Sequence, residues 1–259
     1  MTEPGHPTPA RTIDSKDVNR ALRTVVWPAL DRLGFGRRTS RTAWRDRGAV
    51  IQVVNFQSFN SYLADGMGAT TFSFCVNLGV YVPEIASISG MSAFLRDPAR
   101  PQEPQCQARK HLAKSIAQLD GPRRRERVDP SPNPVSPRAW VDRPDVWFVH
   151  ADGSNVDDVV LDARDRILAD GLPWLERLSD LGEARRHFAE VPDSRLGAGI
   201  LGEQYGWTLG SPNRLQSLGA LSAALGDEAG LRAIVSTMRE TRYFVEHPAA
   251  LNRLIARLN

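Results

Sequence analysis

The chain has 259 residues, of which 41% are hydrophobic, 24% are charged and two are cysteines, and its formal net charge is +3. These values are typical of a globular protein and exclude the disordered, collagen-like and disulfide-dense classes. Since no apolar run approaches the roughly 20 residues that cross a bilayer, and the N-terminus lacks the features of a secretory signal, we expect a cytoplasmic protein without a membrane span.

The N-terminal part predicts a disordered tail followed by a helix. Residues 1–13 are rich in proline and threonine and show no apolar period, which is typical of a loose terminus. From Asp14 or Ser15 to Gly34, apolar residues recur at the spacing of one helical face. Pro28 lies inside this pattern and lacks a backbone donor, so we expect a kink or a break there.

Between Thr42 and Val82 the apolar period changes to two, which predicts antiparallel strands. In the strand 71–82 the phenylalanines, leucine and valines share one face, which we expect to pack against helices. The opposite face of this strand, together with the preceding strand at roughly 49–59, carries more polar side chains. The residues we expect on this partly polar face are Asn55, Gln57, Ser73, Cys75, Asn77 and Tyr81.

The middle of the chain is harder to assign. Residues 105–119 fit either a helix or the beginning of a strand, and both stay open. Residues 121–137 hold five prolines and the cluster Arg123, Arg124, Arg125 and Arg127, which predicts a long exposed loop. A short strand is expected around 145–150.

The rest of the chain predicts helices. An apolar stripe predicts a helix over 154–170 that Gly171 and Pro173 end, and later segments keep apolar spacings of three and four. We therefore expect an α+β fold: an antiparallel sheet of about four to five strands, packed by helices on one face. The expected domains are a tail (1–13), an α+β core (14–180) with the loop at 121–137, and a helical subdomain (181–259).

No motif predicts a cofactor or metal. Gly197, Gly199 and Gly202 match the glycine pattern of dinucleotide sites, but a helix end and a turn precede them instead of the strand that such a site requires. Cys106 and His111 are five residues apart, a spacing that lets them share an ion on neither a strand nor a helix. We therefore expect neither a cofactor nor a metal.

Two further kinds of chemistry stay open. Cys75 could serve as a nucleophile with Asn77, Gln57 and a histidine, either His111 or His150, although a structural thiol is the commoner role. Residues 109–127 hold seven basic and two acidic side chains, which makes the four arginines a candidate polyanion site. The absence of aromatic side chains that could stack on bases argues against nucleic acid.

Several blocks of the sequence resemble one protein family. The blocks are ALRTVVWPALDRLGF at residues 21–35, VNFQ at 54–57, FSFCVNLGVY at 72–81, DVWF at 145–148, GLPWL at 171–175, and SPNR and AALGD within 211–227. In this order they resemble the bacterial family called domain of unknown function 4304, over most of residues 15–240. The family has no established activity, so the resemblance implies a fold alone, within which residues 121–137 look like an insertion.

These observations favour a binding protein over an enzyme. The leading hypothesis is a non-catalytic protein-binding or regulatory module, whose partner is another bacterial protein and whose contact residues are Asn55, Gln57, Ser73, Asn77 and Tyr81. The alternatives are an enzyme whose site is assembled from distant residues at the sheet face, and nucleic-acid binding through Arg123 to Arg127. The oligomeric state does not follow from the sequence.

Overall fold

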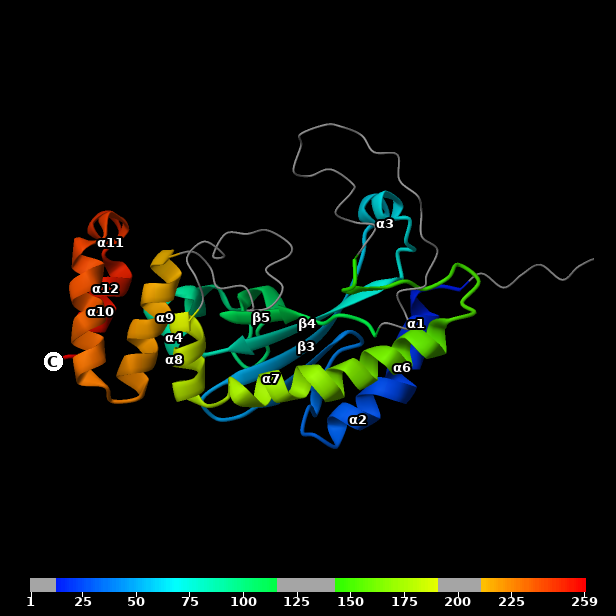
Figure 1. The fold of residues 1–259 in the computed structure, drawn as a ribbon, viewed down its shortest axis with the longest axis horizontal. Coiled ribbons are helices and arrows are strands. Elements are labelled where there is room, and N and C mark those ends of the chain that lie inside the picture. Colours follow the sequence, from blue (N-terminus) through cyan, green and yellow to red (C-terminus); the bar gives the residue numbers. More distant parts are fainter. Residues whose placement is uncertain (1–12, 116–142, 191–210) are drawn as a thin grey trace, which may run out of the picture.

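The computed structural model describes residues 13–115, 143–190 and 211–259. Figure 1 shows a central sheet, a layer of helices that runs along one of its faces, and a stack of C-terminal helices at one end. No helix within these ranges is long and apolar enough to cross a membrane.

The sheet is antiparallel throughout, with the order β1-β2-β3-β4-β5, and β6 also pairs with β4. Because β3 occupies one edge of β4, β5 and β6 share the other: β5 is opposite residues 77–80, and β6 is opposite Phe74 and Cys75. The strands are β1 (Arg37–Arg38), β2 (Thr42–Asp46), β3 (Ile51–Ser58), β4 (Phe74–Tyr81), β5 (Ala108–His111) and β6 (Val146–Trp147).

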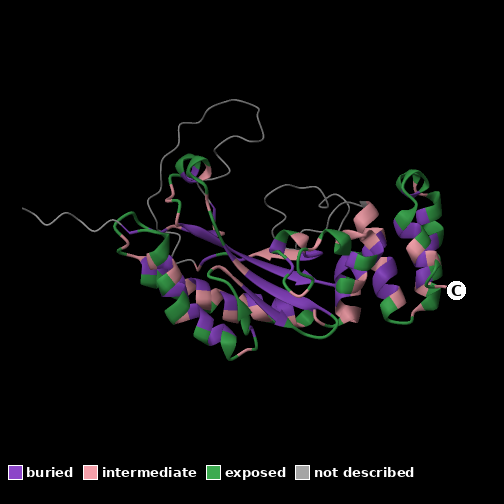
Figure 2. Cartoon of the chain, turned by 180° about the vertical axis from the view of Figure 1, so that it is seen from behind, coloured by how far each residue is buried: buried purple, intermediate pink, exposed green. Residues whose placement is uncertain are grey.

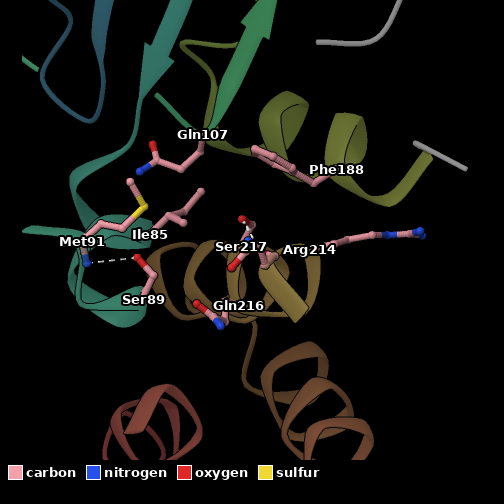
Figure 3. A pocket seen from close by; sticks show the side chains of 9 residues that line it. Ile85, Ser89, Met91, Gln107, Phe188, Arg214, Gln216 and Ser217 are labelled. Atoms are coloured by element: carbon pink, nitrogen blue, oxygen red, sulfur yellow. Dashed lines mark hydrogen bonds between the residues drawn. The ribbon is translucent and has the colours of Figure 1, made fainter. Parts of the chain in front are cut away.

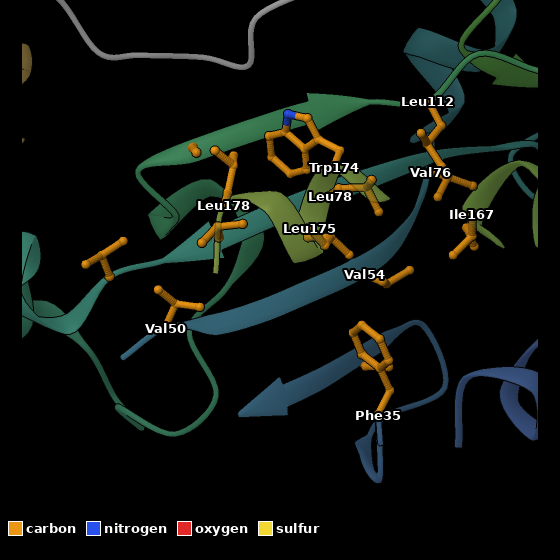
Figure 4. Close-up of a cluster of buried hydrophobic side chains, with 14 of the residues drawn as sticks. Phe35, Val50, Val54, Val76, Leu78, Leu112, Ile167, Trp174, Leu175 and Leu178 are labelled. Carbon is orange, nitrogen blue, oxygen red and sulfur yellow. The ribbon is translucent and has the colours of Figure 1, made fainter. Parts of the chain in front are cut away.

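Two helical runs cover the first face of the sheet. The first run is α1 (Ser15–Ala21), η1 (Leu22–Val26) and α2 (Trp27–Asp31), and the second is α6 (Val156–Arg166), η5 (Ile167–Gly171) and α7 (Leu172–Arg177). Val76 and Leu78 of β4 pack here with Ile167 and Leu175 of the second run, as Figure 4 shows. The alternation of β4 therefore places its apolar side chains under helices, as the sequence predicts.

Both helical runs pass through a proline without ending. Pro28 follows the π-helical turn η1, and Pro173 follows the π-helical turn η5. A π turn shifts the backbone bonds by one residue, which accommodates a residue without an N–H. The expectation that Gly171 and Pro173 end the helix is therefore wrong. An added Cβ at Gly171 would lie 3.0 Å from Leu78 Cδ1, so this glycine instead lets the helix approach the sheet closely.

Other segments cover much of the second face. They are α3 (Ser61–Met67) at one end, and α4 (Pro83–Ser89), η2 (Met91–Phe94) and η3 (Glu103–Gln105) toward the other. Cys75 packs with Met67 and Val146, and Trp44 and Tyr81 pack with Cys106. All eight residues of β4 are consequently buried, and the strands are purple almost throughout in Figure 2. Burial of the second side of β4 is more complete than the sequence predicts.

The C-terminal helices attach to the end of the sheet through α4. They are α8 (Leu181–Glu190), α9 (Ser211–Ala224), α10 (Glu228–Glu240), α11 (Arg242–Glu246) and α12 (Ala249–Ile255). Arg253 Nε donates to the carbonyl of Ile88 (2.8 Å), and Arg257 pairs with Glu84 (2.8 Å). Leu251 and Leu254 belong to the same continuous core as the first face of the sheet. These helices are thus docked on the sheet-bearing part.

The α+β prediction is confirmed, although the sheet has six strands instead of four or five. The open question over 105–119 is resolved in part, because residues 108–111 form the strand β5. Of the expected tail, Ile13 is buried and residues 1–12 lie outside the described ranges, as does the expected loop 121–137.

Candidate functional site

Four polar residues lie in one row across the second face of the sheet. The strand register pairs Thr42 with Asn55, Asn55 with Asn77, and Asn77 with His111. Residues directly opposite each other in antiparallel strands present their side chains on the same face. One residue from each of β2, β3, β4 and β5 therefore faces the same side, and we call these four residues the polar row.

Hydrogen bonds connect the buried middle of the polar row to the protein surface. Asn55 Nδ2 donates to Thr42 Oγ1 (2.8 Å), and Asn77 Nδ2 donates to Gln57 Oε1 (2.7 Å). Asn77 has no exposed surface, whereas Gln57 is exposed. The Gln57 side chain therefore covers Asn77 on the side where the row meets solvent.

Two atoms of the polar row are buried without a hydrogen-bond partner among the described residues: Asn77 Oδ1 and His111 Nδ1. Leu112 N donates to the Val76 carbonyl, so the neighbouring pair of Asn77 and His111 is of the non-hydrogen-bonded type, in which Cα atoms are about 4.5 Å apart. A buried polar atom without a partner costs about 1–3 kcal/mol. Two adjacent residues of the row thus each carry a buried polar atom whose hydrogen bonding is incomplete.

The charge state of His111 follows from its burial. Desolvation lowers the pKa of His111 below its usual value, while Asp145 and Glu103 oppose that shift. Arg109 and Arg143 lower it further. The imidazole is therefore neutral at physiological pH, with one ring nitrogen as donor and the other as acceptor.

Cys75 lies on the same face, two residues before Asn77, but its thiol is not activated. Its Sγ donates to Asp145 Oδ2 at 3.7 Å, and Asp145 in turn pairs with Arg143. Burial and the Asp145 carboxylate raise the pKa of Cys75 far above its usual value. Since the thiolate is the reactive form, Cys75 is a protonated structural thiol. The structure brings together Cys75, Asn77, Gln57 and His111 without activating the nucleophile.

Apolar clusters and exposed aromatic rings flank the polar row. One cluster holds Trp44 and Tyr81, and the other holds Met67 and Cys75. The segments that complete these clusters each carry a large exposed ring: Tyr62 on α3 and Phe94 on η2 are both 84% exposed. Both rings are therefore accessible to a partner.

Two residues predicted for this face have structural roles. Ser73 precedes β4, and its Oγ accepts hydrogen bonds from the backbone N–H groups of Thr70 and Val149. Tyr81 is buried in the cluster with Trp44. Neither is available to a partner, because a hydrogen-bonded turn holds the first and apolar packing covers the second.

The remaining sequence candidates lie elsewhere. Arg123, Arg124, Arg125 and Arg127, and the glycines at 197, 199 and 202, are outside the described residues. Among the described residues, no group of three or more histidine, cysteine or acidic side chains could hold a metal ion. Cys106 is buried and its Sγ donates to the Gln102 carbonyl at 3.7 Å.

The sequence alone does not single out Thr42 or Tyr62. Thr42 joins the row only through the register of β2 on β3, which periodicity does not specify. Tyr62 could have been recognised from the helical spacing of Leu63 and Met67, which places both on one stripe and Tyr62 beside it. Asn55, Gln57 and Asn77 lie where the period-two pattern predicts them.

Comparison with known proteins places the chain in a family of unknown function. The model of the family "Domain of unknown function (DUF4304)" matches residues 26–177. No curated protein and no solved structure matches the chain. The family match covers the sheet, α2 and the second first-face run from α6 to α7. It begins after α1 and ends before α8, so the later blocks within 211–227 lie outside it.

Proposed function

We propose that this chain, which belongs to the DUF4304 family, is a non-catalytic binding protein whose second sheet face receives a segment of another protein. The observation that carries the proposal is the hydrogen bond from Asn77 to Gln57, which joins a buried and incompletely bonded amide to an exposed one. A partner that displaces Gln57 gains access to polar atoms whose bonding is incomplete.

A polypeptide suits these atoms chemically. Each residue of an extended segment carries one N–H donor and one C=O acceptor. Its N–H can supply the donor that Asn77 Oδ1 lacks, and its C=O can replace Gln57 Oε1 as the acceptor for Asn77 Nδ2, while a neighbouring peptide group contacts His111 Nδ1. The displaced Gln57 amide would bond to water instead, at little cost. Tyr62 and Phe94 add exposed rings of the kind that dominate protein interfaces.

The electrostatics of the face support binding over catalysis. The raised pKa of Cys75 keeps its thiol protonated, and the neutral His111 meets Asn77 instead of the thiol in the strand register. Such a module could block or regulate the activity of the partner that binds to this face. We place this binding protein in the cytoplasm. Polyanion binding through Arg123 to Arg127 is the second candidate function.

The test is recovery of a stoichiometric partner from lysate of the source cells by the immobilised full chain. The variants Gln57→Ala and Tyr62→Ala change the proposed surface, and Tyr243→Ala changes an exposed tyrosine on α11, far from it along the chain. We expect Tyr62→Ala to weaken the partner at least tenfold, as loss of a binding hot spot does, and Tyr243→Ala to leave it unchanged.

Two results would count against the proposal. One is the absence of any stoichiometric partner under conditions in which the chain is folded. The other is a partner whose affinity falls with Tyr243→Ala but not with Gln57→Ala or Tyr62→Ala, because such a partner binds the C-terminal helices.

A further inference from the structure

A small pocket lies where the family-matched region meets the C-terminal helices. Figure 3 shows it between α4, α8 and α9, with Gln107 entering from the segment before β5. Gln107 belongs to the matched region, whereas Gln216 and Ser217 lie on α9, beyond it. The pocket therefore draws its polar groups from two parts of the chain that come together only in the folded structure.

Gln107 presents a donor without an acceptor. Its side chain is 5% exposed, and its Oε1 accepts a hydrogen bond from Val82 N (2.7 Å). A backbone N–H can only donate, so this bond fixes which end of the amide is the oxygen. The Nε2 group at the other end has no partner among the described residues.

Gln216 presents the complementary group. It is also 5% exposed, and its Oε1 has no partner within the described part of the chain. The hydroxyls nearby are already bonded: Ser217 Oγ donates to the Asn213 carbonyl (2.8 Å), and Ser89 Oγ donates to the Ala86 carbonyl (3.2 Å). Among the buried side-chain atoms of the described lining residues, those without a partner are thus one donor and one acceptor, both from glutamine side chains.

The size and lining of the pocket limit what it can hold. The enclosed cavity measures about 20 Å³, and the free space including the open mouth is about 330 Å³. The first volume admits one group of the size of a water molecule, while the mouth admits a few more heavy atoms. Ile85, Met91 and Phe188 supply apolar contacts. Arg214 is the one charged residue among the described lining residues, and it donates to the Ala189 carbonyl.

We propose that this pocket binds a small neutral molecule through a primary carboxamide. The ligand carbonyl accepts from Gln107 Nε2, the ligand NH₂ donates to Gln216 Oε1, and a short apolar substituent contacts Ile85, Met91 and Phe188. A carboxamide is a neutral group that supplies an acceptor and a donor from one planar unit. Because the two glutamines belong to different parts of the chain, the bound ligand would strengthen the docking of the C-terminal helices.

The test uses the full chain and isobutyramide as the probe. Its matched control ligand is 3-methyl-2-butanone, which has nearly the same shape and the same carbonyl but no N–H donor. We expect isobutyramide to shift the side-chain amide NMR signals of Gln107 and Gln216 saturably, in the millimolar range that so small a ligand can reach. The ketone, which leaves Gln216 Oε1 unsatisfied, should bind about tenfold more weakly.

A second arm changes the protein. Gln216→Met keeps the volume of the side chain and removes the acceptor, so isobutyramide should lose its advantage over the ketone. Gln57→Met removes a glutamine from the sheet face and should leave the affinity for isobutyramide unchanged. Tyr62→Ala should weaken the protein partner and likewise leave the affinity for isobutyramide unchanged. The experiments therefore distinguish a failure of the carboxamide-binding proposal from a failure of the protein-binding proposal.

The proposal is overturned if isobutyramide produces no saturable shift of the two glutamine signals, or if the ketone binds the wild-type chain equally well. It is also overturned if a crystal soaked with isobutyramide shows ordered water alone between Gln107 and Gln216. The comparison of the two ligands on the wild-type chain decides the matter even if Gln216→Met fails to fold.

Discussion

His111 on β5 lies directly opposite Asn77 on β4, and each carries a buried polar atom without a partner among the described residues. The pair belongs to a row that continues through Asn55 to Thr42, and it reaches the surface through Gln57. A polar row of this kind, between two apolar clusters, lowers the stability of the folded chain. Its effect on stability and its role in binding can be measured separately.

Replacing Asn77 tests the cost. Asn77→Leu substitutes an apolar side chain of similar volume at a position with no exposed surface, and it removes the unpartnered Oδ1 atom. The exposed Gln57 then bonds to water. We expect the free energy of unfolding to be unchanged or to rise by about 1–2 kcal/mol, measured by urea denaturation. A loss of more than about 2 kcal/mol would mean that the Asn77 amide stabilises the fold.

The titration of His111 makes stability depend on pH. Burial lowers the pKa of His111 in the folded state, so below the unfolded value of about 6.5 the unfolded chain binds a proton that the folded chain does not. Stability from this source is complete above that pH and falls as the pH is lowered toward the folded pKa. We expect His111→Gln to flatten the pH dependence of unfolding below the unfolded pKa of about 6.5. A slope that stays as in the wild type after His111→Gln would contradict this assignment.

Gly79 allows a close approach between β4 and the segment before β5. A Cβ built at Gly79 would lie 2.5 Å from Cys106 Sγ and 2.8 Å from Cys106 Cβ. Both residues are in the interior, so we expect Gly79→Ala to cost about 2–3 kcal/mol or more. Gly66→Ala on α3 is the control, because its Cβ would meet nothing within 4 Å and the helix should gain up to about 1 kcal/mol. Equal thermal stability of the two variants would contradict this packing.

Arg45 ties the sheet to the first-face helices. Its guanidinium donates to Gln52 Oε1 (2.6 Å), the Leu33 carbonyl (2.8 Å) and Glu176 Oε1 (2.7 Å). Arg45→Met leaves the buried Gln52 Oε1 without its donor and removes the bonds to the Leu33 carbonyl and to Glu176. We expect a loss of about 2–3 kcal/mol. The control variant is Arg242→Met, because the exposed ion pair between Arg242 and Glu246 should contribute less than about 0.5 kcal/mol to the free energy of unfolding. Similar chemical denaturation curves for both variants would refute the role of Arg45.

The sequence predicts the first face of the sheet well and the second face only in part. Strict alternation from Phe74 to Val80 specifies which side chains pack under helices, because the side-chain period of a strand is two. The polar residues of β3 and β4 follow from the same rule. The cover over the second face does not, since residues 91–106 form short turns and 3-10 helices without a repeating apolar pattern.

Proline and register account for the other differences. Pro28 suggests a kink or a break and Pro173 suggests a helix end, whereas a π turn before each proline keeps the chain helical. Residues 108–111 are too short a strand for periodicity to distinguish from a helix. His111 could therefore not be placed opposite Asn77, nor Gln107 beside α9, until the strand pairing and the helix docking were known.

The most direct test of the central claim is site-specific photo-crosslinking from position 57. A photoreactive amino acid in place of Gln57 reports which molecule covers the exposed end of the polar row. A matched chain carries the same group in place of Arg23, an exposed residue of η1 on the opposite side of the sheet. The account predicts a cross-link from position 57 to a segment of another protein, and none from position 23. A partner that cross-links from position 23 and not from position 57 would contradict it.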